Sequence, residues 1–275
     1  MGSFRGSAVP VPSWKHFEVA VDQGAATITF ARPEKLNALT FEVYADLRDL
    51  LTELSQRDGI RVLTITGSGR GFCSGGDVNA IIGALQSMDP RDLLAFTRMT
   101  GTVTQRIREA PFPVIAAVNG VAAGAGAVLA LAADLRIVAR SASFAFLFTR
   151  VGLSGGDMGA AYLLPRLIGV GRATELLLYG ERVDAERALA VGLATELVSD
   201  DQLATRAHEL ARRFASGPAL AYAATRLLIA REQDMSLHAA LELDTMTQAL
   251  LMKSGDHAEF YEAFRSGRDA KWTGR

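Results

Sequence analysis

The sequence predicts an α/β fold that ends in a helical C-terminal region. Between residue 17 and about residue 184, apolar strand-like segments alternate with segments of helical periodicity, and short loops separate them. This alternation favours a parallel sheet joined by right-handed crossovers. From about Asp184 the chain becomes mostly helical, and its composition shifts near residue 200. Because 49% of the 275 residues are hydrophobic, we expect a large buried core.

The first predicted elements are a β-hairpin and a helix. In FEVAVDQGAATITF, residues 17–30, apolar and polar residues alternate on both sides of a DQG turn, as they do in two paired strands. Between Phe41 and Leu54 the apolar residues recur at helical spacing. Thr40 directly precedes this segment, and its hydroxyl suits the N-cap of the predicted helix.

The middle of the chain repeats strands and helices around two glycine-rich loops. RVLTITG (61–67) reads as a buried strand, and the first glycine loop, SGRGFCSGGD (68–77), follows it. Residues 79–109 predict two helical pieces that are broken at an Asp-Pro pair. PVIAAVNG (113–120) predicts the next strand, and the second glycine loop opens the small-residue helix AAGAGAVLALAA (122–133).

The remaining segments complete the predicted α/β region. DLRIVA (134–139) and SFAFLF (143–148) read as strands, and the loop Ser154–Gly156 leads to the helix YLLPRLIG (162–169). Long helical segments then continue to the C-terminus. We therefore expect a lead over residues 1–16 without ordered structure, a core over 17–200 and a helical oligomerisation region over 201–275.

Composition and charge exclude several classes of function. The net charge of −1 argues against a nucleic-acid partner, which would need clustered lysines and arginines. The longest apolar run, residues 121–133, is too short to span a membrane, and the N-terminus lacks the apolar core of a signal peptide. The four histidines show no metal-ligand spacing, so no metal is expected. The single cysteine, Cys73, fits a reducing cytoplasm.

The two glycine loops are the chemically distinctive features of the sequence. Each lies between a strand and a helix, where glycines allow backbone N–H groups to turn toward a ligand. Two such loops can place one N–H each on the same oxygen and form an oxyanion hole. Tight turns with close helix–sheet packing are the alternative reading of either loop alone.

Four ordered motifs resemble the crotonase (enoyl-CoA hydratase/isomerase) superfamily. They are ARPEKLNALT, TGSGRGFCSGGDVNA, PVIAAVNGVAAGAGAVLALAADLRIVARSASF and the segment that begins VGLSGGDMGAAYLLPRLIG. The likeness covers roughly residues 17–275. It implies a spiral of ββα units, a trimer or a hexamer of two trimers, and an acyl-CoA thioester as ligand. Coenzyme A would arrive as part of the substrate, with no separate cofactor.

The resemblance also assigns binding residues. It places the two oxyanion-hole amides on Gly76 and Ala125, where alanine replaces the family's usual glycine. It further implies that the coenzyme A arm and the substrate lie along two short segments, with these residues as contacts: Glu34, Lys35, Leu36, Ser74, Gly76, Asp77 and Val78.

The acid residues depart from the family's hydratase pattern. Val128 and Phe148 stand where the two glutamates of hydratases would line the acyl site, and neither side chain can transfer a proton. Asp157 lies in the loop where isomerases and dehalogenases of the family carry a working aspartate. Its carboxylate would abstract a proton next to the thioester, and this role is favoured because the other acid positions are empty. The alternative role is the cap of a helix that begins near Met158, and the two roles are not exclusive.

Four hypotheses about function follow from these residues. Hydration of a 2-enoyl-CoA is the family's commonest reaction and is the leading expectation, with an atypical acid/base set. Isomerisation of an enoyl- or dienoyl-CoA stands nearly level with it, because it needs only one acid/base group and Asp157 would supply it. A hydrolase or decarboxylase that acts through the same enolate or oxyanion chemistry is the third enzymatic option. A non-catalytic acyl-CoA-binding homologue is the fourth hypothesis, and it would have no need of Asp157.

Overall fold

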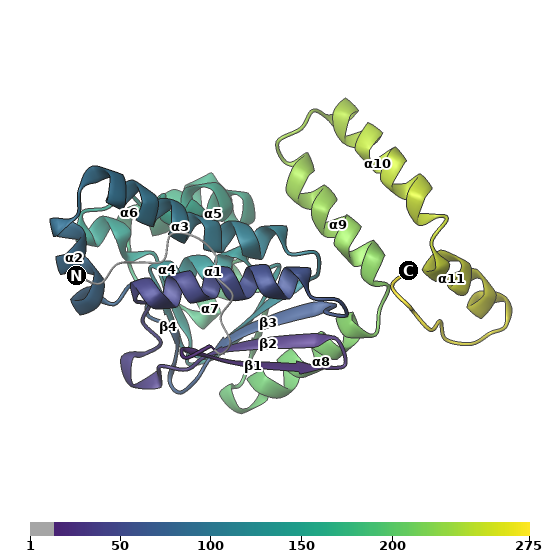
Figure 1. Ribbon diagram of the computed structural model, residues 1–275, viewed down its shortest axis with the longest axis horizontal. Coiled ribbons are helices and arrows are strands. Elements are labelled where there is room, and N and C mark those ends of the chain that lie inside the picture. Colours follow the sequence, from purple (N-terminus) through teal and green to yellow (C-terminus); the bar gives the residue numbers. More distant parts are fainter. Residues whose placement is uncertain (1–13) are drawn as a thin grey trace.

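Two β-sheets form the framework of the protein (Figure 1). The computed structural model describes residues 14–275. The larger sheet has six strands in the order β1-β2-β3-β5-β7-β10, and only β1 runs antiparallel to its neighbour. Its strands are β1 (Phe17–Asp22), β2 (Ala25–Phe30), β3 (Val62–Gly67), β5 (Val114–Val118), β7 (Leu135–Ala139) and β10 (Glu196–Val198).

The smaller sheet takes the second strand of each repeating unit. Its four strands are β4 (Gly71–Cys73), β6 (Val121–Ala123), β8 (Ser143–Ala145) and β9 (Val183–Asp184). In the pairs β3–β4, β5–β6 and β7–β8, the first strand joins the larger sheet and the second joins the smaller one before the chain continues into a helix. This arrangement confirms the spiral of ββα units that the crotonase resemblance implies.

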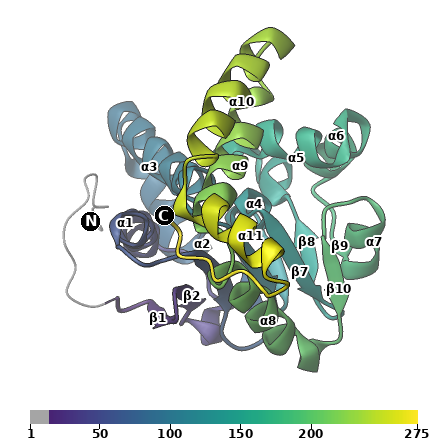
Figure 2. The same ribbon diagram turned by 90° about the vertical axis from the view of Figure 1, so that its right-hand side faces the viewer.

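Helices surround the two sheets and bury a single continuous core. Those of the core region are η1 (Pro33–Lys35), α1 (Phe41–Gln56), α2 (Val78–Ser87), α3 (Pro90–Glu109), α4 (Ala125–Ala132), η2 (Leu147–Val151), η3 (Asp157–Gly159), α5 (Ala160–Ile168), α6 (Val170–Tyr179), α7 (Ala185–Ala190), η4 (Asp200–Gln202) and α8 (Leu203–Ala215). Helix α4 is buried along its whole length, as its small apolar residues allow. Helix α7 lies beside β10 at one edge of the larger sheet (Figure 2).

Most local predictions are confirmed, and one strand is shorter than expected. The Thr40 side chain accepts a hydrogen bond from the Val43 amide at 3.3 Å and caps α1. The helical break falls at Asp89, which caps α3. The segment 143–148 was predicted as one strand, but β8 ends at Ala145 and a 3₁₀-helix follows. An apolar run this short does not distinguish a strand from a buried helical turn.

The last three helices project from the body as an arm (Figure 1). They are α9 (Ala219–Glu232), α10 (Leu237–Leu251) and α11 (Gly255–Arg265). Helix α9 has no buried residue, whereas α8, which also belongs to the predicted region 201–275, packs against the larger sheet. No helix among residues 14–275 is both long and apolar enough to cross a bilayer.

Arg226 is one of the residues that join the arm to the body. Arg226 on α9 forms an ion pair with Asp134 and donates hydrogen bonds to the carbonyl oxygens of Ala110 and Ile107. Asp134 therefore pairs with a residue 92 positions away. The nearby Arg136 donates hydrogen bonds to the carbonyl oxygens of Leu193 and Ala133.

Candidate active site

The two glycine loops lie in contact, at the ends of neighbouring strands β4 and β6. At Gly75 the φ angle is +91°, and a Cβ built there would lie 2.7 Å from the carbonyl oxygen of Ala123 and 3.4 Å from the amide nitrogen of Ala125. A Cβ at Gly126 would lie 2.0 Å from the carbonyl oxygen of Cys73. Only glycine permits this close approach, which sets the first loop against the N-terminus of α4.

The amide of Gly76 is left unpaired by the way its loop is held. Leu39 forms an isolated parallel bridge to Gly76, in which the Leu39 amide donates to the Gly75 carbonyl and the Leu39 carbonyl accepts from the Asp77 amide, both at 2.8 Å. In a parallel bridge of this kind the central residue turns its own N–H and C=O away from the partner. Gly76 therefore points its N–H away from Leu39.

The amide of Ala125 is unpaired for a different reason. Ala125 is the first residue of α4, and the first N–H groups of a helix have no partner within it. The preceding Gly124 amide donates to the Ala145 carbonyl at 2.8 Å. Ala125 is not among the described residues with positive φ, so alanine fits this position without strain. Within residues 14–275, neither the Gly76 nor the Ala125 amide has a hydrogen-bond partner.

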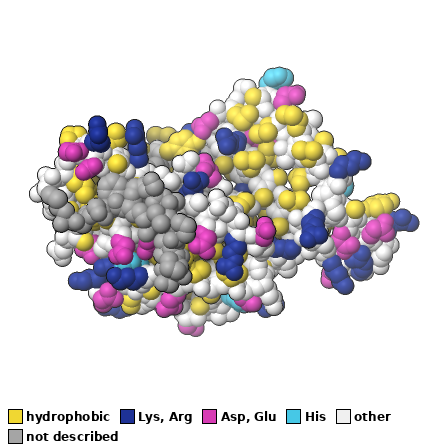
Figure 3. Space-filling model, viewed as in Figure 1, with side chains coloured by type: hydrophobic (Ala, Val, Ile, Leu, Met, Phe, Trp, Pro, Cys, Tyr) yellow, Lys and Arg dark blue, Asp and Glu magenta, His cyan; other side chains and the backbone are white. Residues whose placement is uncertain are grey.

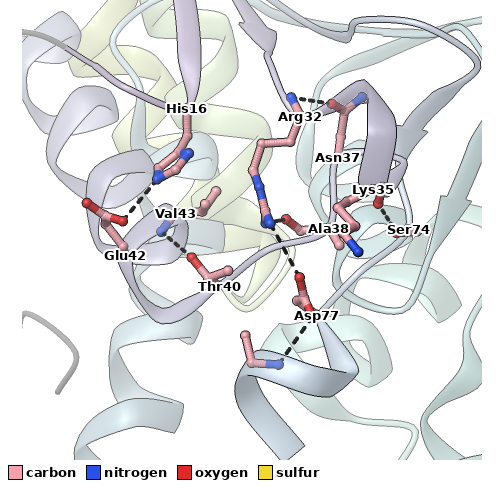
Figure 4. A network of polar contacts seen from close by, with 11 residues as sticks. His16, Arg32, Lys35, Asn37, Ala38, Thr40, Glu42, Val43, Ser74 and Asp77 are labelled. Carbon is pink, nitrogen blue, oxygen red and sulfur yellow. Dashed lines mark hydrogen bonds and ion pairs between the residues drawn. The ribbon is translucent and has the colours of Figure 1, made fainter. Parts of the chain in front are cut away.

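The predicted coenzyme A segments come together beside this pair of amides. The Ser74 amide donates to the Leu36 carbonyl at 3.0 Å, and the Ser74 hydroxyl donates to the Lys35 carbonyl at 3.4 Å (Figure 4). Glu34 and Lys35 belong to η1 in the same segment. Val78, at the start of α2, is 67% exposed. Residues 34–36 and 74–78, predicted from separate motifs, therefore form one continuous surface.

Arg32 holds these two segments in register and was not predicted as a site residue. Its guanidinium donates to the Ala38 carbonyl at 2.5 Å and lies 3.4 Å from a carboxylate oxygen of Asp77 (Figure 4). The Asp77 side chain also caps α2 by accepting from the Ala80 amide at 3.2 Å. The only sequence signal for Arg32 is its place in the motif ARPEKLNALT.

Asp157 does not cap α5. That helix begins at Ala160 and has Gly159 as its N-cap, without a side-chain bond. The Asp157 carboxylate accepts one hydrogen bond from the adjacent Met158 amide at 2.9 Å. Met158 itself has a left-handed backbone with φ +51°, a conformation that costs a non-glycine residue about 1 kcal/mol or more. The loop thus presents the carboxylate at the expense of local strain.

The surroundings of Asp157 favour its protonated form. Burial is the main cause that raises the pKa of Asp157, and the Met158 hydrogen bond opposes this only in part. Val128 is fully buried, and Phe148 is 7% exposed. A raised pKa makes the ionised carboxylate a stronger base, which suits it to accepting and returning a proton.

Two other groups of polar side chains lie close together in the structure. Tyr162 is 43% exposed, and its hydroxyl donates a hydrogen bond to Asp234. Ligand atoms of His16, Glu42 and Asp46 lie within 4.8 Å of one another, a grouping that the spacing of histidines did not reveal. His16 and Glu42 already bond to each other at 3.0 Å (Figure 4).

Neither the Cys73 thiol nor the two surface hollows contribute to the candidate site. Cys73 is fully buried, and burial raises its pKa to about 12, so the thiol is unreactive. Two hollows of about 120 and 390 Å³ are lined by residues 175–187 and by residues 22–25 with 208–216, respectively. Neither hollow includes a residue of the predicted site. The candidate site is therefore identified by the two amides without hydrogen-bond partners among residues 14–275, on Gly76 and Ala125, and by Asp157, and not by a cavity.

Two features together define the crotonase class of proteins. They are a spiral of ββα units that builds two sheets, and two glycine loops that each present one backbone amide without a partner. Residues 20–275 match the family model for enoyl-CoA hydratase/isomerase, and the chain belongs to that family. It is 39% identical to 1,2-epoxyphenylacetyl-CoA isomerase of Escherichia coli K12, over 93% of this chain and 97% of that protein. It is 38% identical to a probable enoyl-CoA hydratase of Rhodobacter capsulatus, over 96% and 100%.

A solved structure is still more similar. A provisionally named enoyl-CoA hydratase from Streptomyces coelicolor A3(2) shares 61% of its residues with this chain, with a TM-score of 0.95 and complete coverage of both chains. The Bacillus anthracis enoyl-CoA hydratase superimposes with a TM-score of 0.89 at 30% identity and covers 95% of this chain. These comparisons place the whole described fold within the family.

Replacing Asp157 is expected to stabilise the protein. Because the pKa of Asp157 is raised in the folded state, its ionisation opposes folding above that pKa, and this cost disappears below the ordinary carboxyl pKa of about 4. Asp157→Asn should therefore raise the melting temperature at pH 7 by on the order of 2 °C. The difference in melting temperature between Asp157→Asn and the wild type should narrow as the pH falls toward 4. Asp201→Asn, at an exposed aspartate, is the control, and an unchanged or lower melting temperature for Asp157→Asn would contradict the expectation.

Removing the Ala125 amide is expected to stop catalysis without unfolding the protein. Proline is favoured at the first position of a helix, so Ala125→Pro removes the N–H at a place where α4 tolerates it. Loss of one oxyanion donor lowers kcat by about 10²-fold or more. Val170→Pro, at the first position of α6, is the matched control and should keep full activity. Retained activity in Ala125→Pro would remove this amide from the site.

Proposed function

We propose that the protein isomerises the carbon–carbon double bond of an enoyl-CoA or dienoyl-CoA thioester, with Asp157 as the acid/base group. The observation that carries the proposal is that Asp157 supplies one partly buried carboxylate, whereas the two hydratase glutamate positions carry none. Asp157 has a raised pKa, whereas Val128 and Phe148 occupy the hydratase glutamate positions. Isomerisation requires a single group that removes a proton and returns it, so one carboxylate is sufficient.

The reaction balances without a cofactor. The Asp157 carboxylate takes a proton from C2 of a 3-enoyl thioester, and the electron pair moves onto the thioester oxygen. The Gly76 and Ala125 amides stabilise the resulting enolate. As the carbonyl re-forms, the proton returns from Asp157 to C4, and the double bond shifts from C3–C4 to C2–C3. Residues 34–36 and 74–78 would hold the coenzyme A arm meanwhile.

Hydration of a 2-enoyl-CoA is the second candidate. It is favoured by the names of relatives such as the (E)-benzylidenesuccinyl-CoA hydratase of Thauera aromatica, which is 32% identical over 92% of this chain. The first candidate is favoured by the name of another relative, the trans-2-decenoyl-[acyl-carrier-protein] isomerase of Streptococcus mutans, which is 28% identical over 93% of this chain. Hydration would need a second proton-transfer group besides Asp157, and this requirement ranks it lower.

We further propose that three copies of the chain assemble through the arm, as a trimer or a pair of trimers. Apolar side chains gather over α9 and α10, and a surface of this kind is unusual for a monomer (Figure 3). Residues of the arm with exposed apolar side chains are Leu227, Ile229, Leu237, Leu241, Met246, Leu250, Met252, Phe260 and Phe264. We also propose a cytoplasmic location, because a single cysteine fits a reducing compartment.

Product analysis distinguishes the candidate reactions. Wild type and Asp157→Asn are mixed with crotonyl-CoA, a 3-enoyl-CoA and a 3,5-dienoyl-CoA, and the products are separated by mass and retention. We expect a product of unchanged mass and shifted retention from the wild type, and a rate at least about 10²-fold lower from the variant. A mass gain of one water would establish hydration instead. Binding without any reaction in wild type would support the non-catalytic homologue.

The pH dependence supplies a second readout of the same proposal. Asp157 must be ionised to accept the first proton, so kcat/KM should rise with pH through the pKa of Asp157 and then level off. Because burial raises that pKa, the rise should occur above the ordinary carboxyl value of about 4. A rate independent of pH across this window would contradict the role of Asp157.

Sedimentation tests the assembly. Wild type should sediment as three or six copies of the 29.3 kDa chain at micromolar concentration. Leu250→Glu places a charge on a side chain that is 76% exposed and should shift the protein toward monomer. Gln248→Glu, at an exposed polar position on the same helix, is the matched control. A monomeric wild type would contradict the proposed assembly.

A further inference from the structure

Tyr44 places a hydroxyl group next to the first oxyanion amide. Tyr44 belongs to α1, and only 5% of its surface is exposed. A Cβ built on Gly76 would lie 3.9 Å from the Tyr44 hydroxyl oxygen. The Tyr44 ring packs edge-on against Phe96, with ring centroids 5.8 Å apart. This packing fixes the direction in which the hydroxyl points.

The hydroxyl has no role within the folded chain. Among residues 14–275 no hydrogen bond is formed by the Tyr44 side chain. Although the ring is buried, the hydroxyl oxygen keeps some accessible surface, so a ligand can reach it. The hydroxyl also lies within the electrostatic reach of Asp157. The hydroxyl therefore lies near the Gly76 backbone and close enough to Asp157, the proposed proton-transfer group, to feel its charge.

The phenol is a hydrogen-bond donor rather than a base. Burial, with smaller contributions from Cys73 and Asp157, raises the pKa of Tyr44 well above its ordinary value. The group therefore stays neutral across the working pH range and keeps its proton available for donation. A neutral donor that faces a developing negative charge stabilises that charge without a change in protonation.

We propose that the Tyr44 hydroxyl donates a third hydrogen bond to the thioester oxygen of a bound acyl-CoA, beside the bond from the Gly76 amide. The inference rests on the proposed function, since it assumes a thioester at the paired amides. The bond strengthens as the oxygen gains charge in the enolate, so Tyr44 acts mainly on the reaction rate.

Acetoacetyl-CoA tests this role without turnover. Its enolate absorbs in the near ultraviolet, so a pH titration of the bound ligand reports how strongly the site stabilises an enolate. Tyr44→Phe should raise the apparent pKa of the bound ligand by about one unit, which is a tenfold loss of enolate at fixed pH. With a substrate that turns over, kcat should fall about tenfold while KM changes little.

Two further variants separate a donor role from a packing role. Tyr222→Phe is the matched control, because Tyr222 also packs edge-on against a phenylalanine, Phe214, but belongs to the arm. It should leave the titration unchanged. Tyr44→3-fluorotyrosine keeps the ring and strengthens the donor, so it should lower the apparent pKa of the bound ligand.

The outcomes distinguish this inference from the proposed function. Equal titrations of wild type and Tyr44→Phe, with the bound ligand ionised in both, would overturn the role of Tyr44 and leave the enolate chemistry standing. A wild type that binds acetoacetyl-CoA but does not favour its enolate would overturn both. A shift in Tyr44→Phe accompanied by the opposite shift with 3-fluorotyrosine would support the hydrogen bond.

Discussion

The parallel bridge between Leu39 and Gly76 is the constraint on which the site depends. It uses the Gly75 carbonyl and the Asp77 amide, so the chain between them has no freedom to turn the Gly76 amide inward. The same few bonds join the end of β4 to the segment that precedes α1. The unpaired amide is therefore a result of ordinary sheet geometry, and it requires no unusual residue beyond glycine. At Ala125, helix geometry leaves the second amide unpaired.

A second property of the candidate site is that Asp157, its proposed acid/base group, is placed at a cost to stability. Burial disfavours the ionised form of Asp157, and the left-handed backbone at Met158 adds strain in the same loop. Asp157 caps no helix, although the neighbouring Met158 side chain packs into the core. Residues that reduce stability in this way are typical of functional sites. The body of the fold, with its continuous core and buried α4, compensates for them.

The sequence predicted what local patterns determine and missed what distant residues determine. Alternation at 17–30 and the hydroxyl of Thr40 were sufficient for the hairpin and the start of α1, because both depend on neighbours in the chain. The ion pair of Asp134 with Arg226 joins residues 92 positions apart, and no local pattern indicates it. Tyr44 was missed for a related reason: on the apolar face of α1 it reads as core. Only the fold shows that its hydroxyl meets Gly76.

The burial of Cys73 has a practical consequence for the study of this protein in solution. Its thiol is sealed in the native state, and its carbonyl oxygen packs against Gly126 between the two glycine loops. A thiol reagent can reach the sulfur only when the surrounding structure opens, and the chain carries no other cysteine that would react. The rate of labelling therefore reports how often the fold opens around Cys73. A ligand that binds across the two glycine loops and holds them together should slow that rate as its occupancy rises.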